Sequence, residues 1–451
     1  MNITLRQSTL IVISTLAAAL LTALNAAEPE SVIRKLKIEV VKTLPSPVIG
    51  KDTPGAETIP GGFEGGTSVK LKIGGKTQYH LFSTGMQKLD WSRFRLEHWI
   101  SDDGNRFQRK EILMEDSMDT NGWKHLPLFP YPFFSKPDDR WYMIFFEYVV
   151  KGAWNGQCGT MWCAPCKRAG IEGIDGPWEF EKRYVIVPKK CAPINNVIPV
   201  STSLSIPFQI LDGRWAVMVS TDYFEEGKQR WPVVLNFSDN QKGPFNPPDT
   251  AVVPQMMEPT DFTENPLVLK VKGPKSGRDY WVAVFDFIAP EVTAYQPKNV
   301  FGFSYSDDGI NWPKEHGQAV NIDKGLAPGQ TGWWRGAWAI RTPHMMVDEG
   351  DGTYTIYFTG GSADNYLSAF RAVGKVTVRL IEEESVAKAP VVDTQAAFAP
   401  LVKAGQEFAT DGIHLNSAGY RVMADALLEC WGREDQAGRD RKRPRFQRMM
   451  R

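Results

Sequence analysis

The sequence predicts an all-β fold, a five-bladed β-propeller followed by a short helical segment. Three observations support this prediction: one short motif recurs five times between residues 60 and 380, an aromatic and β-branched segment follows each copy, and no helical periodicity separates them. The copies begin at Glu64, Pro130, Ser205, Glu264 and Arg341, at spacings of 59 to 77 residues. A large β-sandwich is the alternative, but a sandwich does not require one opening motif five times.

Each copy of the motif is predicted to open an antiparallel hairpin. Four copies carry proline at the third position, which suits a strand start because the ladder needs no N–H there. The expected second strands are rich in aromatic and β-branched residues, and they lie at 79–82, 141–145, 215–218, 280–285 and 354–358. Asp-Asp-Gly turns at 102–104 and 307–309 supply the positive-φ residue that a tight turn needs. When several such antiparallel units are arranged radially around one axis, each unit forms one blade of a β-propeller.

Composition narrows the functional classes. The chain has 451 residues, 42% of them hydrophobic and 23% charged, with 52 basic residues against 52 acidic ones. This composition allows a large core and excludes a disordered chain. The even charge balance argues against a nucleic-acid partner, and no cofactor is expected; the oligomeric state cannot be inferred.

The first 27 residues are predicted to be an export signal. Arg6 gives a basic start, 9–24 is an uncharged apolar run, and Asn25-Ala26-Ala27 offers a small-residue cleavage site. We expect a secreted or periplasmic protein with no membrane association after cleavage; a retained anchor is the alternative.

Five cysteines are compatible with that compartment. They are Cys158, Cys163, Cys166, Cys191 and Cys430. The Cys163-Ala-Pro-Cys166 pair lacks the second pair that a zinc site would need. We expect one or two disulfides, or buried thiols, among the first four.

Several motifs resemble the five-bladed glycoside hydrolases of the arabinanase, levansucrase and invertase group. They are Glu64-Gly-Gly with Tyr79-His-Leu-Phe82, Thr263-Glu-Asn-Pro-Leu267, Ser306-Asp-Asp-Gly-Ile-Asn-Trp312, and Arg341-Thr-Pro with Asp351-Gly-Thr-Tyr354. The resemblance covers about residues 60–380 and implies hydrolysis of glycosidic bonds in poly- or oligosaccharides, with 28–384 as the propeller. A glycan-binding propeller without turnover is the alternative.

Two carboxylates and a cation are expected to converge where the five openings meet. Glycoside hydrolysis needs one carboxylic acid to protonate the leaving oxygen and one carboxylate as base or nucleophile. The resemblance favours Glu264 as the acid and Glu64 as base or nucleophile, and Arg341 would bind a hydroxyl or lower a neighbouring pKa. Members of the group usually place Asp in the first blade and a third carboxylate in the second or third. The candidates for that third carboxylate are Asp222, Asp261 and Asp286. A salt-bridge network between blades is the purely structural alternative.

Aromatic side chains near the openings are candidates for sugar contacts, because sugars stack their C–H faces on rings. The residues concerned are Trp123, Tyr131, Trp333, Trp334 and Trp338, although most such rings pack between blades.

His344 follows the fifth opening and is a further candidate to bind substrate. The resembling group sometimes holds a metal ion near such a histidine, but no ligand set accompanies His344, so a hydrogen-bonded core residue is expected and no metal is assigned.

The C-terminal part carries a second resemblance. Residues 390–432, with Asp411-Gly-Ile-His414, resemble the last block of SGNH (GDSL-type) hydrolases, in which such an Asp and His would complete a serine triad. No Gly-Asp-Ser nucleophile block is present, so we expect a detached remnant, a gene fusion or a docking helix, with a helix at 418–431. An active carbohydrate esterase is the second functional alternative. The tail 433–451 has eight basic and three acidic residues and is expected to be disordered.

Overall fold

The computed structural model describes the propeller and its closing strands. The described residues are 31–89, 92–151, 159–194, 200–225, 228–257, 263–287, 300–334, 340–361 and 370–387. The chain divides into two compact units, of which Lys35–Glu383 holds the blades. In the other unit, Met1–Arg34 with Glu384–Arg451, the described part includes a hydrogen bond of 3.0 Å from Arg34 Nε to Glu384 Oε1. The predicted signal peptide, the SGNH-like segment and the basic tail lie outside the described residues.

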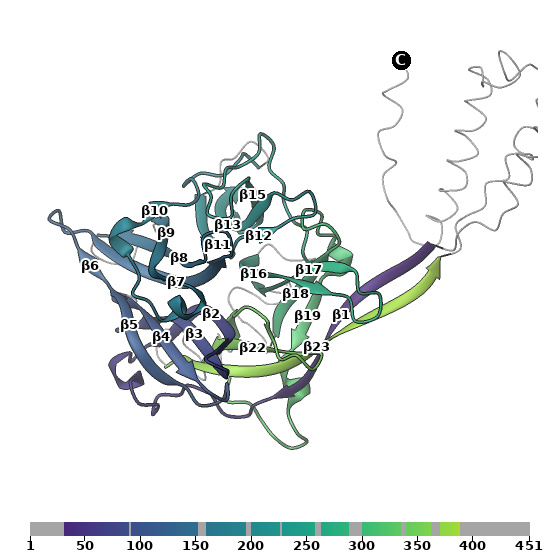
Figure 1. Ribbon diagram of the computed structural model, residues 1–451, viewed down its shortest axis with the longest axis horizontal. Coiled ribbons are helices and arrows are strands. Elements are labelled where there is room, and N and C mark those ends of the chain that lie inside the picture. Colours follow the sequence, from purple (N-terminus) through teal and green to yellow (C-terminus); the bar gives the residue numbers. More distant parts are fainter. Residues whose placement is uncertain are drawn as a thin grey trace, which may run out of the picture. The chain divides into compact units, whose positions relative to one another are not determined.

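Five antiparallel sheets form the five blades that the repeat predicts (Figure 1). Blade 1 contains β2 (Gly62–Ile73), β3 (Lys76–Met86), β4 (Phe94–Ser101) and β5 (Gln108–Glu115). Blade 2 contains β7 (Lys124–Ser135), β8 (Arg140–Val150), β9 (Thr160–Ala169) and β10 (Tyr184–Val185), with β6 (Ser117–Met118) at its edge. Blade 3 contains β11 (Val200–Leu204), β12 (Phe208–Gln209), β13 (Trp215–Glu225), β14 (Lys228–Arg230) and β15 (Val233–Ser238).

The last two blades complete the ring. Blade 4 contains β16 (Thr263–Lys272), β17 (Asp279–Phe287), β18 (Val300–Ser306) and β19 (Gln318–Asn321). Blade 5 contains β20 (Ile340–Pro343), β21 (Val347–Asp348), β22 (Thr353–Gly360), β23 (Ala372–Ala387) and the first strand of the chain, β1 (Ser31–Thr43). Because β1 pairs with β23, an early and a late segment share one sheet, and Val48 N donates to Val373 O at 2.8 Å just beyond β1. The repeated motif did not predict this pairing of the two ends of the propeller.

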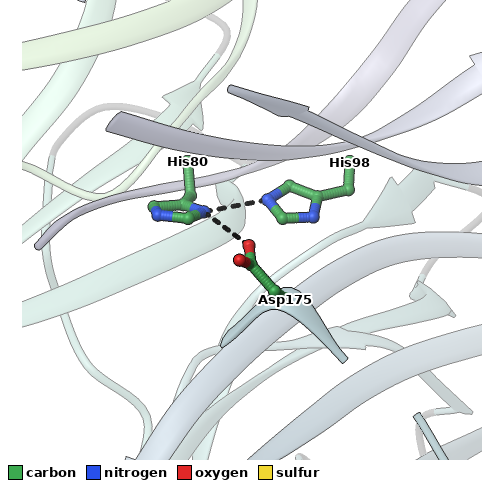
Figure 2. A group of neighbouring side chains, drawn as sticks. All are labelled: His80, His98 and Asp175. Carbon is green, nitrogen blue, oxygen red and sulfur yellow. Dashed lines mark hydrogen bonds and ion pairs between the residues drawn. The ribbon is translucent and has the colours of Figure 1, made fainter. Parts of the chain in front are cut away.

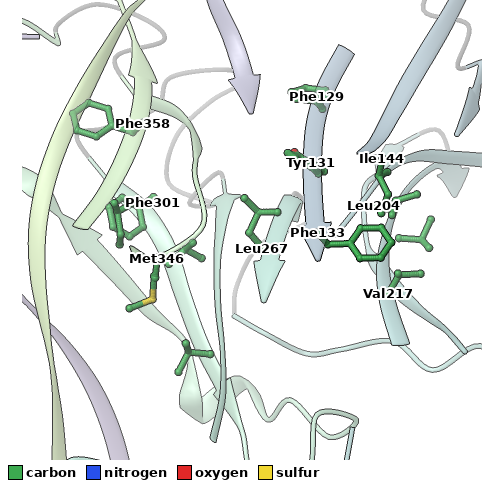
Figure 3. Packing of buried hydrophobic residues seen from close by; sticks show 14 of the residues in the cluster. Phe129, Tyr131, Phe133, Ile144, Leu204, Val217, Leu267, Phe301, Met346 and Phe358 are labelled. Atoms are coloured by element: carbon green, nitrogen blue, oxygen red, sulfur yellow. The ribbon is translucent and has the colours of Figure 1, made fainter. Parts of the chain in front are cut away.

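The second strand of each blade is buried on both faces, which explains its continuous apolar sequence. In β17, Val282 and Val284 enter one hydrophobic cluster while Trp281, Ala283 and Phe285 enter another, as the two-residue period of a strand requires. The larger cluster draws residues from all five blades. Its members labelled in Figure 3 come from blades 2 to 5. Removing such side chains from water, at about 1.5–3 kcal/mol each, stabilises the arrangement of blade on blade.

Helices are short in the described part of the chain. All five are 3-10 turns: η1 (Ala56–Thr58), η2 (Ile171–Asp175), η3 (Phe180–Lys182), η4 (Lys314–His316) and η5 (Ile322–Gly325). None of them has the length or apolar character to cross a membrane. The helix expected at 418–431 lies outside these residues.

Three cysteines fall in the described ranges. Cys163, Cys166 and Cys191 are free, buried thiols, so the buried-thiol alternative is correct for them. Cys158 and Cys430 are outside the described residues.

A β-bulge interrupts the innermost strand of every blade at the same level. The register shifts lie at Phe63/Gly65, Leu128/Tyr131, Ser201/Ser203, Glu264/Leu267 and Arg341/Pro343. Glu64, Leu128, Glu264 and Arg341 each directly precede a residue with positive φ at the bulge, and in blade 3 Ser201 is the last paired residue before the bulge. This corrects the alignment of the motif in two blades, because Leu128 and Ser201, not Pro130 and Ser205, correspond to Glu64, Glu264 and Arg341. The prolines were misleading guides for two reasons. In β7, Pro130 and Pro132 are two residues apart and so lie on the same face of the strand, and Pro207 lies outside β11, which ends at Leu204.

Candidate functional site

The bulges place unusual backbone at the ends of the innermost strands. Phe129, Asn265 and Thr342 have φ of 51°, 52° and 45°, in the left-handed region. For a β-branched residue such as Thr342 this conformation is strained, and strained backbone concentrates at functional sites. Bulges also redirect neighbouring side chains. The backbone at these strand ends therefore determines the direction of the side chains beside Phe129, Asn265 and Thr342.

One hydrogen bond of a repeated type holds each of these three residues. The backbone N–H of the bulge residue donates to a side chain on the second strand of the preceding blade. The pairs are Phe129 N to Thr84 Oγ1 at 2.8 Å, Asn265 N to Ser220 Oγ at 3.1 Å, and Thr342 N to Asp286 Oδ1 at 2.6 Å. In the third pair the acceptor is the carboxylate of Asp286 instead of a hydroxyl. The same type of hydrogen bond therefore places an acidic group at this position.

Blades 1, 2 and 5 approach closely at this level. Gly65 has φ of 143°, and a Cβ there would lie 2.5 Å from Phe129 Cε1 and 2.6 Å from Thr342 Cγ2. Only glycine fits both the conformation and the space. Thr342 Oγ1 also donates to Glu64 O at 3.2 Å, which joins the fifth bulge to the first.

Glu264, Asp286 and Arg341 form one charged group. Arg341 Nη2 donates to Glu264 Oε2 at 3.1 Å, and Arg341 Nε lies 3.7 Å from Asp286 Oδ2. Glu264 and Asp286 face each other across the β16–β17 ladder, and Arg341 comes from β20 of the next blade. The Glu264 side chain is 23% exposed, whereas Asp286 is buried. The group thus has one carboxylate that solvent reaches and one that it does not.

Both carboxyl groups hold a proton more readily than usual. Burial raises the pKa of Glu264, and the charges of Asp286 and Asp222 raise it further, while Arg341 opposes the shift. Burial also raises the pKa of Asp286, against Arg341 and the Thr342 N–H. A raised carboxyl pKa beside a second carboxylate is the environment in which a general acid works near neutral pH.

Tyr131 reaches the same group from blade 2. Burial raises its pKa strongly, and the charges of Asp286 and Glu264 contribute. Its ring packs in the core, but among the described residues the Tyr131 hydroxyl has no hydrogen-bond partner. A buried hydroxyl in that state needs a partner, and one that comes with a ligand satisfies the requirement.

Glu64 has a different environment. Its side chain is 3% exposed and forms an ion pair with the buried guanidinium of Arg371, through Oε2 and Nη1. Arg371 directly precedes β23, and its carbonyl accepts from Phe63 N at 3.0 Å. Arg371 is not predicted as a site residue, because no copy of the repeated motif contains it. Glu264 and Arg341 thus lie together, as expected from the sequence. Glu64 instead forms an ion pair with a different cation, Arg371.

Two other candidates lie in the core. The Trp334 ring is buried, packs edge-on to Phe358 and donates from Nε1 to Asp323 Oδ1 at 2.8 Å, so it does not line a site as proposed from sequence. His344 is buried as expected, but neither ring nitrogen has a hydrogen-bond partner among the described residues. Burial alone lowers its pKa, to about 3, and among the described residues no group of three or more potential metal ligands includes His344.

The remaining candidates are peripheral or not described. Trp333 packs partly buried against the core, and Trp123 lies beneath Lys151 Nζ, 5.6 Å from the ring centroid. Asp222 is half-buried and acts electrostatically on Glu264. Trp338, Asp261, Asp411 and His414 lie outside the described residues.

Comparisons with known proteins give structural similarity only. No protein-family model and no curated protein sequence matches this chain. A thermostable family-43 glycoside hydrolase aligns over 73% of this chain and 97% of its own at 15% identity and a TM-score of 0.45. A family 117 glycoside hydrolase from the marine bacterium Zobellia galactanivorans aligns over 78% and 92% at 11% identity and a TM-score of 0.45. A GH62 hydrolase in complex with xylotriose aligns over 75% and 97% at 10% identity and a TM-score of 0.45. At this similarity, the activity of this chain has to be argued from its own residues.

Proposed function

We propose that this protein is a glycoside hydrolase that cleaves glycosidic bonds of poly- or oligosaccharides with two carboxyl groups. The observation that carries the proposal is the group of Glu264, Asp286 and Arg341, in which a partly exposed carboxyl has a raised pKa. Such a carboxyl can be protonated when substrate binds and can donate its proton to the leaving glycosidic oxygen. The sugar ring would bind where the innermost strands end.

The other residues take supporting roles in this proposal. Arg341 holds Glu264 in place and limits its pKa, and Asp286, fixed by the Thr342 N–H, raises that pKa. Glu64 is the proposed base or nucleophile, and it is held by its ion pair with the Arg371 guanidinium. Tyr131 would offer its hydroxyl to the sugar.

The location of the protein follows from its N-terminal sequence in this proposal. The apolar run at 9–24 after Arg6 supports export, which would bring the enzyme to extracellular or periplasmic glycans. The glycan-binding alternative uses the same strand ends without turnover. It is favoured by one observation, the ion pairs that hold both Glu64 and Glu264.

The test is Glu264→Gln, measured on a panel of polysaccharides and their oligosaccharides. We expect hydrolysis to fall by about 10²–10⁴-fold, because a general acid contributes about that factor, while binding of the same sugar persists. The matched control is Glu349→Gln, because Glu349 is also a half-buried glutamate in an ion pair, 2.7 Å from Lys70 Nζ, and lies outside the charged group. Wild-type protein that binds a glycan and hydrolyses none would establish the binding alternative instead. Equal activity of Glu264→Gln and wild type would remove Glu264 as the acid.

A further inference from the structure

Two buried histidines and an aspartate meet between blades 1 and 2, away from the charged group. His80 lies on β3 and His98 on the neighbouring strand β4, and Asp175 is the last residue of η2, which follows β9 of blade 2 (Figure 2). His80 Nδ1 is 2.9 Å from His98 Nε2 and 3.9 Å from Asp175 Oδ1. One ligand atom from each of the three lies within 4.8 Å of the others.

We propose that His80, His98 and Asp175 bind a divalent transition-metal ion of the zinc class. Two imidazole nitrogens and one carboxylate oxygen are a donor set that suits Zn²⁺. At metal–ligand bonds of about 2.0–2.2 Å, tetrahedral geometry separates neighbouring ligand atoms by roughly 3.3 Å. The His80–His98 and His80–Asp175 separations of 2.9 and 3.9 Å fall on either side of that value, and the third pair lies within 4.8 Å, so side-chain rotations would have to bring Asp175 closer.

The surroundings of His98 orient its ring. Glu111 Oε1 lies 3.6 Å from His98 Nδ1, on the side of the ring away from His80, and His98 Nε2 is the nitrogen that lies next to His80. A carboxylate behind the second nitrogen is the usual means of orienting a metal-bound histidine. His98 also stacks on Phe82 at 4.2 Å between ring centroids, which fixes the plane of its ring.

A purely structural explanation of the two histidines is incomplete. In a His–His hydrogen bond one nitrogen donates and the other accepts, and the outer nitrogens then need partners of their own. His80 Nε2, His98 Nδ1 and Glu111 Oε1 are each buried without a hydrogen-bond partner among the described residues.

Lys110 is the competing cation. Its Nζ contacts Asp175 Oδ1, so without metal the carboxylate forms an ion pair. The Lys110 side chain is 30% exposed and can turn to solvent when an ion binds, and Asp175, at 26%, leaves a route of entry. A bound ion would join the second and third strands of blade 1 to the η2 turn of blade 2.

The test uses the full-length protein, stripped with a chelator and titrated with Zn²⁺ by calorimetry and with Co²⁺ by visible spectroscopy. We expect one ion per chain, d–d bands typical of four-coordinate Co²⁺ with nitrogen and oxygen ligands, and a rise in Tm with Zn²⁺. Asp175→Asn should weaken binding at least tenfold, and Lys110→Met should strengthen it.

The Asp175 and Lys110 side chains are both partly exposed, so the fold should persist when either is substituted. Substitution of the buried His80 or His98 would risk disrupting the fold. His316→Gln is the matched control, since His316 stacks on Tyr305 in blade 4, outside the cluster, and should bind as the wild type does. Absence of stoichiometric binding would overturn the proposal. So would binding that Asp175→Asn leaves unchanged.

Discussion

Glu64 and Glu264 occupy the same position in two blades, directly before a bulge residue with positive φ, yet their environments differ. Glu64 is 3% exposed and paired with the buried Arg371. Glu264 is 23% exposed, and it shares Arg341 with a second carboxylate, Asp286. Blade 1 has Thr84, an uncharged hydroxyl, where blade 4 has Asp286.

The difference shows how a repeated scaffold produces two kinds of carboxyl group. Glu64 forms an ion pair with a buried guanidinium, and blade 1 has the uncharged Thr84 in place of the second carboxylate that Asp286 provides in blade 4. A cation shared between two carboxylates leaves part of their repulsion uncompensated, and this favours a proton on one of them, as the raised pKa of Glu264 indicates. The identity of one side chain on the second strand therefore changes the charge environment of the glutamate beside it.

The largest effect is expected on stability, from one substitution made at both positions. Glu64→Gln leaves the Arg371 guanidinium buried without its counter-charge, so the free energy of unfolding should fall by about 3–5 kcal/mol. Glu264→Gln leaves Arg341 beside Asp286, so the loss should be about 1 kcal/mol or less. Urea unfolding of the two variants measures both values. Equal losses would mean that the two ion pairs do not differ in the way described.

A smaller effect is expected on the pH dependence of hydrolysis. If Glu264 is the acid, the rate falls as pH rises through its pKa. Asp286→Asn removes a charge that raises this pKa, so the alkaline limb should move to lower pH; Arg341→Met removes a charge that lowers it, so the limb should move to higher pH. The pH–rate profiles of both variants measure the direction of each shift. If the alkaline limb moved in the same direction in both variants, Asp286 and Arg341 would not act on the pKa of Glu264 in opposite directions.

The same raised pKa affects stability. A carboxyl whose pKa is raised by folding contributes stability that is complete below the unfolded value of about 4.3 and is lost as pH rises through the folded value. Glu264→Gln should therefore flatten this part of the stability profile.

The smallest effect is expected at Tyr131. Because its hydroxyl has no partner among the described residues, Tyr131→Phe should leave the free energy of unfolding unchanged or raise it by about 1 kcal/mol, while KM for the glycan rises. Tyr280→Phe is the control, since it removes a 2.8 Å hydrogen bond to Glu382 and should destabilise the fold by about 1.5–3 kcal/mol. A Tyr131→Phe variant as destabilised as Tyr280→Phe would show that the hydroxyl has a structural partner.

The sequence by itself determined the blades. Spaced motifs, aromatic second strands and Asp-Asp-Gly turns depend on local chemistry, namely strand propensity, two-sided burial and positive φ at Gly104 and Gly309. The same local signals brought Glu264 and Arg341 into one site, because innermost strands of neighbouring blades lie side by side.

Only the tertiary structure decided which groups complete the sites. Arg371 meets Glu64, β1 closes blade 5, and His80 and His98 meet Asp175, across separations that no local pattern encodes. Bulge positions also depend on strand pairing, which is why the motif was misaligned at Leu128 and Ser201. The physical reason is that burial and charge pairing depend on distance in space, which is set only after the blades have packed against one another.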